Sequence, residues 1–196
     1  MTFFRPLFNP ATGERIQFTA TAETTSGELV RFNWRSEPGG VITEHVHPGQ
    51  EERFIITSGE AHFTLDGTQR IVRAGQTVIV PAGVSHSEGN AGTADVEGIV
   101  ELRPALHAKE WHEALAGIVA DFNTTPRGAP TDLLQLGVTF WHFRRESRVT
   151  SPPIWLQNIV LPPLWALARV FGRRAYYDRW DSRIDSEPPA GEADRY

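Results

Sequence analysis

Residues 39–59 read GGVITEHVHPGQEERFIITSG, and this stretch indicates more about the fold than any other. Alternate side chains of an extended strand point the same way, so His45 and His47 project two imidazoles from one face. Pro48-Gly49 marks a turn, and the carboxylate of Glu52 follows it. Two imidazoles and a carboxylate in so short a stretch are typical of a transition-metal site.

A second stretch supplies a fourth candidate ligand. Residues 75–90 read GQTVIVPAGVSHSEGN, and His86 comes shortly after the turn Pro81-Ala82-Gly83. If neighbouring antiparallel strands bring the two stretches together, three imidazole nitrogens and one carboxylate oxygen converge. That donor set suits Fe, Mn, Ni, Cu or Zn and leaves coordination positions open. The sequence therefore predicts one divalent transition-metal ion held by four residues: His45, His47, Glu52 and His86.

Glu51 is the rival of Glu52 as the carboxylate ligand. In a strand, Glu52 shares a face with Phe54 and Ile56, whereas Glu51 points the other way, beside Arg53. Strand parity therefore favours Glu52 as the inward carboxylate, with Glu51 as the alternative.

Short strands account for most of residues 1–104. Turn sequences such as Asp66-Gly67 separate the runs, and many short strands without intervening helices indicate a sandwich or barrel. The predicted strands are Ile16–Ala20, Leu29–Arg35, Ile42–His47, Arg53–Thr57, Ala61–Leu65, Gln69–Arg73, Thr77–Pro81 and Val96–Leu102. The fold class predicted is all-β with an α-helical appendage.

The pattern becomes helical after Pro104. Trp111, Leu115, Ile118, Val119 and Phe122 fall on one face of a helix. Further predicted features are a second helix capped by Thr131-Asp132, a third from Pro153 to Pro162-Pro163, and a fourth from Leu164 to Phe171 that ends at Gly172. We thus divide the chain into a barrel at 1–104, a helical extension at 105–184 and a mobile tail at 185–196.

The apolar stretch 154–171 allows two interpretations. It contains Gln157, Asn158 and a proline pair, so it is a poor membrane span. We favour a helical pair packed on the barrel or on a second subunit. The alternative is peripheral membrane contact through 154–174, with Trp155 and Trp165 in the headgroup layer and the arginines Arg169, Arg173 and Arg174 facing lipid phosphates.

Composition excludes several classes of protein and site. The formal net charge of −5 argues against a nucleic-acid partner. The chain has no cysteine, which excludes disulfides, thiolate nucleophiles and cysteine-based metal sites. Residues 1–18 lack the pattern of a signal peptide, so we expect a cytoplasmic protein.

The two quoted stretches resemble both signature motifs of the cupin superfamily, spacing included. The fixed positions of the first motif are Gly39, His45, His47, Glu52 and Gly59, and those of the second are Gly75, Pro81, Gly83, His86 and Asn90. The resemblance implies a jelly-roll β-barrel whose mouth holds a metal on the three histidines and the glutamate. It covers about half of the chain directly.

Positions on the predicted strands and helices indicate which other side chains line a pocket and which are exposed. Aromatic strand residues pack by default, but a barrel open at one end turns some of them into pocket walls. The pocket candidates are Trp34, Phe54, His62 and Phe63. His107 and His112 lie on the first predicted helix, mostly off its apolar stripe, and are expected to be exposed.

The leading hypothesis is a small dioxygenase-like oxidoreductase that acts on an oxygenated, apolar or aromatic metabolite, with iron as its metal. One alternative is a non-redox lyase or isomerase that uses Mn, Ni or Zn. Another is a small-molecule binding or sensory protein without catalysis. We also expect a homodimer, because the apolar helical segment offers surface to bury.

Overall fold

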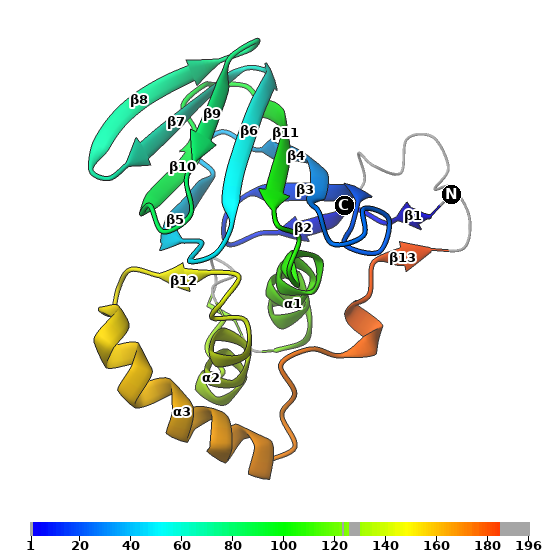
Figure 1. The fold of residues 1–196 in the computed structure, drawn as a ribbon, viewed down its shortest axis with the longest axis vertical. Helices are drawn as coiled ribbons and strands as arrows, with labels where there is room; N and C mark the ends of the chain where they lie inside the picture. Colours follow the sequence, from blue (N-terminus) through cyan, green and yellow to red (C-terminus); the bar gives the residue numbers. More distant parts are fainter. Residues whose placement is uncertain (1, 123, 126–129, 185–196) are drawn as a thin grey trace.

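Two antiparallel sheets form the body of the protein (Figure 1). The computed structural model describes residues 2–122, 124–125 and 130–184. One sheet has the order β2 (Leu7–Asn9), β3 (Glu14–Ala20), β4 (Val30–Ser36), β11 (Val96–Arg103), β6 (Glu51–Ser58) and β9 (Thr77–Val80). The other has the order β12 (Arg148–Val149), β5 (Val41–Val46), β10 (His86–Asn90), β7 (Glu60–Leu65) and β8 (Thr68–Arg73). The predicted fold class, a β-barrel followed by helices, is confirmed.

Strict alternation along the central strands builds the core between the sheets. In β6, Glu52, Phe54 and Ile56 are buried, whereas the residues between them are partly exposed. Phe63 of β7 meets Phe54 with 4.9 Å between ring centroids. Each sheet therefore contributes one apolar face, and the strand parity that buries Phe54 also turns Glu52 inward.

Each predicted strand coincides with an observed one. The short strands β1 (Phe3–Phe4), β2, β12 and β13 (Arg183–Ile184) were not predicted, and neither was β10. Its sequence, HSEGN, contains no β-branched or aromatic residue, so local propensity gives no signal. It is a strand because β5 and β7 pair with it on both sides, with His86 opposite His45 on one side and Leu65 on the other. Tertiary pairing thus decides the structure of the segment that begins with His86.

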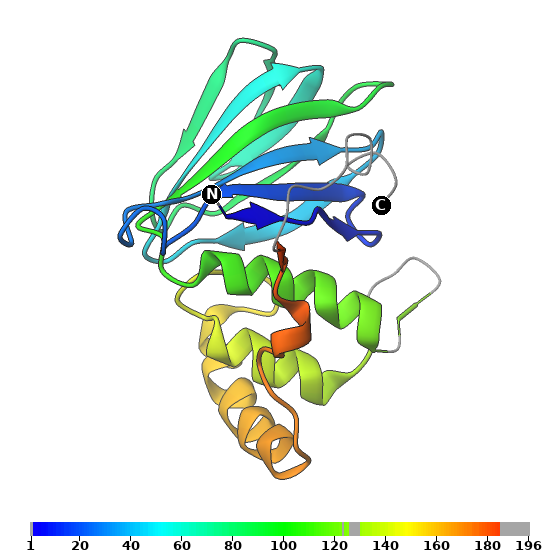
Figure 2. The ribbon, with the colours of Figure 1, turned by 90° about the vertical axis from the view of Figure 1, so that its right-hand side faces the viewer.

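Three helices lie to one side of the barrel, with α1 next to the strands and α3 outermost (Figures 1 and 2). They are α1 (Ala108–Asp121), α2 (Leu133–His142) and α3 (Ile154–Val170), followed by the short helix η1 (Asp178–Trp180). Asp132 caps α2 as predicted, because its carboxylate accepts a hydrogen bond from the Gln135 amide at 2.9 Å. A second apolar cluster holds the helices together: Trp111, Ala114, Ile118, Val138, Phe143, Ala168, Ala175 and Trp180.

The prediction of two helices separated at Pro162-Pro163 was wrong, because α3 runs through both prolines. Proline cannot donate the usual amide hydrogen bond, which leaves the carbonyls of Asn158 and Ile159 without their helical partners. Both residues are exposed, so water can satisfy these carbonyls. Among the residues that the structure describes, no helix is long and apolar enough to cross a bilayer.

Segments beyond Pro104 add strands next to the barrel. Val149 of β12 pairs with His45 of β5, and β13 (Arg183–Ile184) pairs with β1 (Phe3–Phe4). The division of the chain at residue 104 stays a prediction. The predicted mobile tail, 185–196, lies outside the described residues.

Candidate metal centre

Four side chains converge at one end of the barrel, as the sequence predicts. They come from both sheets, and their nearest ligand atoms all lie within 4.8 Å of one another: His45, His47, Glu52 and His86. His45 and His86 face each other across the β5–β10 pair, and β6 brings Glu52. All four are at most 8% exposed.

Backbone carbonyls orient the three imidazoles. Nδ1 of His45 lies 2.9 Å from the Thr43 carbonyl oxygen, and Nδ1 of His86 lies 3.1 Å from the Val84 carbonyl oxygen. An Nδ1–H that donates to a carbonyl leaves Nε2 unprotonated and able to bind a metal. The same holds for His47, whose Nδ1 lies 2.5 Å from the carbonyl oxygen of Glu146, in the segment between α2 and β12.

The Nε2 atoms and one carboxylate oxygen meet at the centre. Nε2 of His45 is 3.2 Å from Nε2 of His47. The Glu52 Oε2 atom lies 2.9 Å from His86 Nε2 and 3.3 Å from His47 Nε2. When the Nδ1 atoms of both rings donate to carbonyl oxygens, neutral imidazoles turn two Nε2 lone pairs toward each other, and a bound cation would relieve their repulsion. The donor set therefore fits a divalent transition metal.

Glu52, not Glu51, belongs to this cluster. Glu52 is 4% exposed and lies among the imidazoles. The Glu51 side chain is 41% exposed and lies 3.8 Å from the Arg53 guanidinium. The strand parity that favours Glu52 thus places its carboxylate in the cluster and that of Glu51 outside it.

The electrostatics of the cluster favour a bound cation. Burial would raise the pKa of Glu52, but the imidazoles of His47 and His86 hold it well below its usual range. Burial and the neighbouring imidazoles lower the pKa of His45 to about 3. Near neutral pH, Glu52 is therefore ionised and His45 is neutral, which are the protonation states of metal ligands.

A cavity of ≈ 260 Å³ adjoins the cluster and lies between the barrel and the helices. Its wall is mainly apolar and includes Phe32, Phe54, Val100, Trp111, Leu115, Ile118, Val119, Leu136 and Phe140. The helices α1 and α2 supply six of these nine side chains, so the helical extension helps to form the wall.

Of the predicted pocket residues, only Phe54 lines this cavity. Trp34 is buried in the core, where its ring meets Phe54 edge-on at 5.9 Å. Phe63 is also buried in the core. His62 lines a separate shallow hollow with Arg70. Its imidazole leans over Gly89 of the neighbouring strand, where a Cβ would lie 2.5 Å from its Cε1 atom.

Three titratable residues of the cavity wall were missed by the sequence analysis. His112 was expected to be exposed, but it lines the cavity and its ring lies 5.0 Å from that of Phe32. Its Nδ1 is 2.7 Å from the Ala108 carbonyl oxygen. Glu14 and Glu88 line the same cavity. No local signal marks any of them, because their positions depend on how α1 packs against the barrel and on how β3 and β10 pair within it.

The carboxyl groups of Glu14 and Glu88 both have a raised pKa. Burial and the nearby Glu52 carboxylate raise the pKa of Glu14 to about 7. Burial, with Glu52 and Glu14, raises the pKa of Glu88 well above its usual range. One oxygen of Glu88, Oε2, is buried without a hydrogen-bond partner in the described structure. The wall thus carries two carboxyl groups, those of Glu14 and Glu88, that keep their protons to a higher pH than usual and lie near the clustered side chains.

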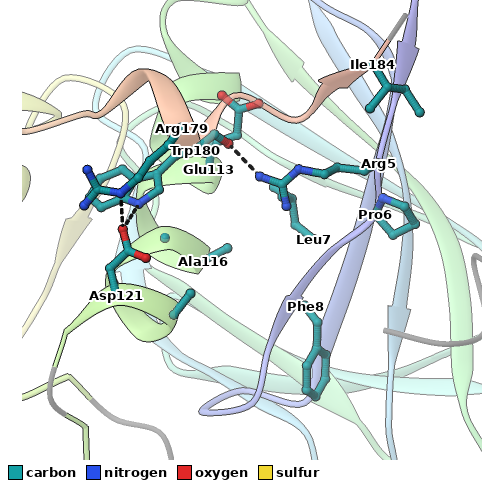
Figure 3. A pocket seen from close by; sticks show the side chains of 12 residues that line it. Arg5, Pro6, Leu7, Phe8, Glu113, Ala116, Asp121, Arg179, Trp180 and Ile184 are labelled. Atoms are coloured by element: carbon teal, nitrogen blue, oxygen red, sulfur yellow. Dashed lines mark hydrogen bonds and ion pairs between the residues drawn. The ribbon is translucent and has the colours of Figure 1, made fainter. Parts of the chain in front are cut away.

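A larger hollow of ≈ 620 Å³ lies elsewhere, between the N-terminal strands and α1 (Figure 3). Its arginines are already bonded. Arg5 donates to the Trp180 carbonyl at 3.2 Å, and Arg179 donates to the Asp121 carboxylate at 2.6 Å (Figure 3). None of the four candidate metal ligands lines this hollow, so the chemistry of the site belongs to the smaller cavity.

Comparison with known proteins agrees with the geometry. Protein SchB of Streptomyces halstedii is 34% identical over 84 residues, which cover 43% of this chain and 59% of SchB. Oxalate oxidase 2 of Hordeum vulgare is 34% identical over 73 residues, which are 33% of each chain. The chain thus spans less than two thirds of the length of these relatives.

Solved structures similar to this one include a predicted oxalate decarboxylase from Thermotoga maritima, with a TM-score of 0.46 and 22% identity over 53% of this chain and 93% of that one. The family model described as Cupin domain matches residues 32–100, which include all four clustered side chains. Residues 32–100 of this chain therefore form a cupin domain.

Proposed function

We propose that this protein is a metal-dependent, dioxygenase-like oxidoreductase whose substrate is an uncharged, oxygenated and largely apolar small molecule. The observation that carries the proposal is a three-imidazole, one-carboxylate cluster that opens onto an apolar cavity. Such donor sets leave coordination positions open for a substrate oxygen. A bound redox-active ion such as Fe(II) would supply the activation of dioxygen.

The charge of the cavity wall supports an uncharged substrate. Within the described chain, no lysine or arginine lines the cavity, whereas Glu14 and Glu88 do. A small dianion would meet the bound metal but no second cationic group. Ionised glutamates would repel it, and protonated ones would offer only single hydrogen bonds. Some relatives are named oxalate oxidases, but this wall disfavours a dicarboxylate.

Polar groups at the wall can orient a hydroxyl or carbonyl of the substrate. The unpartnered Oε2 of Glu88 gains a hydrogen bond if a ligand hydroxyl lies beside it. His112 donates from Nδ1 to the Ala108 carbonyl, which leaves Nε2 as a proton acceptor. Burial lowers the pKa of His112, so the imidazole stays neutral near pH 7. A neutral imidazole that lines the cavity is suited to accept a proton from an enol or phenol.

Oxygen consumption after anaerobic loading with Fe(II) tests the proposal. The substrate panel contains catechols, flavonol-like enols and 1,3-diketones, with oxalate for comparison. We expect metal-dependent oxygen uptake with at least one uncharged member and none with oxalate. The His86→Ala variant should abolish the uptake, whereas His62→Ala, which changes a histidine outside the cavity, should retain it.

Other outcomes would contradict the proposal. Turnover of the panel without oxygen uptake would indicate a lyase or isomerase. Metal-dependent binding of panel members without any turnover would indicate a binding or sensory protein. Uptake with oxalate alone would contradict the assignment of substrate charge while leaving the oxidoreductase class intact.

A further inference from the structure

The outermost helix has an apolar face that is largely exposed in the described structure. Gln157 and Ala168 are buried on the side of α3 that faces the protein. The opposite side carries Trp155, Ile159 and Val170, which are 65%, 63% and 81% exposed. At 100° per residue, these three and Ala166 lie within one narrow sector, with Pro163 at its edge. We call these five residues the outer face of α3.

This arrangement departs from that of a surface helix in a soluble protein. Such a helix buries one apolar stripe and presents polar side chains on the other side. The inner side of α3 already packs on α2, where a Cβ at Gly137 would lie 2.9 Å from Cβ of Leu164. Of the large hydrophobic residues exposed in the described structure, most lie between 154 and 171: Ile154, Trp155, Ile159, Val160, Trp165, Leu167, Val170 and Phe171. The outer face is therefore a second apolar surface.

The charge around the helix is one-sided. Residues 147–177 contain four arginines, at 148, 169, 173 and 174, and no aspartate or glutamate. The whole chain has 19 basic and 24 acidic residues, so the remainder has 15 basic and 24 acidic ones. Arg169 and Arg174 are exposed near the C-terminal end of α3. A positive rim beside an apolar face on an otherwise acidic protein is complementary to an anionic surface with an apolar interior.

We propose that the outer face of α3 binds an anionic membrane surface, with the helix lying in the plane of the headgroups. Trp155 would enter the boundary between headgroups and acyl chains, where aromatic rings are favoured. Arg169 and Arg174 would contact lipid phosphates. At 1.5 Å per residue, the 17 residues of α3 extend over roughly 25 Å, enough for several lipids along its length.

A second copy of this chain is a poorer occupant than a membrane. Parallel pairing of two outer faces would place the arginines of one helix close to those of the other. Antiparallel pairing would separate them, but each set would then face the other end of the partner helix, and residues 147–177 contain no acidic residue to pair with them. A membrane instead presents phosphates to these arginines and apolar chains to the outer face. The position of α3 at the rim of the molecule leaves it free to approach a flat surface (Figures 1 and 2).

Vesicle flotation tests the proposal with the full chain. We expect it to float with vesicles of phosphatidylcholine and phosphatidylglycerol, more weakly with phosphatidylcholine alone, and less in high salt. Ile159→Glu should weaken binding about tenfold or more, because it places a charge in the apolar layer. Arg169→Gln and Arg174→Gln should each weaken binding to anionic vesicles about fivefold. Ile71→Glu, at an exposed residue of β8, is the matched control and should bind like the wild type.

Two further measurements keep the outcomes distinct. Tryptophan emission should shift to the blue on binding, and Trp155→Phe should remove most of that shift while it retains flotation. Sedimentation velocity without vesicles reports self-association. A dimer that Ile159→Glu dissociates, with no vesicle binding by the wild type, would overturn the proposal in favour of a second copy. A monomer that binds neither vesicle type would overturn it outright.

Discussion

His45 and His86 face each other across the antiparallel β5–β10 pair, with 4.2 Å between their ring centroids. In each residue, Nδ1 lies beside the carbonyl oxygen of the residue two positions earlier, Thr43 or Val84. In both strands, the same short-range contact between Nδ1 and a backbone carbonyl thus directs Nε2 toward the centre of the cluster. The backbone fixes ring orientation before any metal binds, which lowers the entropy cost of binding.

Removal of either imidazole should therefore strongly weaken metal binding. We expect His86→Ala to lower affinity for a divalent transition metal by about 100-fold or more, since loss of an outer-sphere partner alone costs 10–100-fold. Elemental analysis of protein purified without a polyhistidine tag, together with metal titration, measures the loss. His62→Ala should keep wild-type metal content. Full metal content in His86→Ala would contradict the assignment of the centre.

Adjacent glutamates provide a second matched pair. Glu52→Gln removes the only carboxylate from the cluster and should reduce metal affinity by a factor similar to that for His86→Ala. Glu51→Gln changes an exposed side chain beside Arg53 and should leave affinity within about twofold. Because ligand binding stabilises the folded state, the rise in Tm on metal addition should be present in Glu51→Gln and greatly reduced in Glu52→Gln. The reverse order would make Glu51 the ligand.

The barrel and the four clustered side chains could be predicted because their signals are local. Side-chain alternation, turn residues and the spacing of His45, His47 and Glu52 all lie within single strands and hairpins. The inward direction of Glu52 follows from the same parity that buries Phe54. These features need no knowledge of what packs against them.

The cavity wall could not be predicted, because it depends on the packing of distant segments. His112 lies beside the apolar stripe of α1 and looks exposed in sequence, yet α1 lies against the barrel and turns that flank toward Phe32. Glu88 belongs to β10, which has no strand propensity of its own. The continuity of α3 through Pro162 and Pro163 likewise depends on exposed carbonyls, which propensity rules do not consider.

A buried ion pair makes the helical part sensitive to the loss of one charge. Lys109 Nζ lies 2.9 Å from Glu113 Oε2 and 2.9 Å from Asp181 Oδ1, and the Lys109 and Glu113 side chains are 7% and 0% exposed. Glu113 also accepts hydrogen bonds from Ser182 and Tyr176, so it links α1 to the C-terminal segment. Loss of the cation leaves a buried carboxylate without its partner.

Lys109→Met should therefore lower the free energy of unfolding by about 3–5 kcal/mol. Urea denaturation of the metal-free protein measures the change. Arg73→Met removes the exposed ion pair with Glu60 and should cost less than about 1 kcal/mol. A small effect of Lys109→Met would mean that water reaches Glu113. Combining Lys109→Met with Glu113→Gln should recover part of the loss, because no buried charge then remains.

Glu14 should make the metal-free protein less stable as the pH rises. Burial and the Glu52 carboxylate raise its pKa from 4.5 to about 7, so the folded state holds a proton that the unfolded state releases above pH 4.5. The unfolded state is then favoured increasingly between pH 4.5 and about 7, by at most about 3 kcal/mol in total. Glu14→Gln, which is neutral at every pH, should lack this loss.

We therefore expect the free energy of unfolding of Glu14→Gln minus that of the wild type to increase between pH 4.5 and about 7 and to level off above that range. Glu60→Gln, at an exposed carboxylate, should follow the wild type. A constant difference between Glu14→Gln and the wild type would show that Glu14 titrates normally in the cavity.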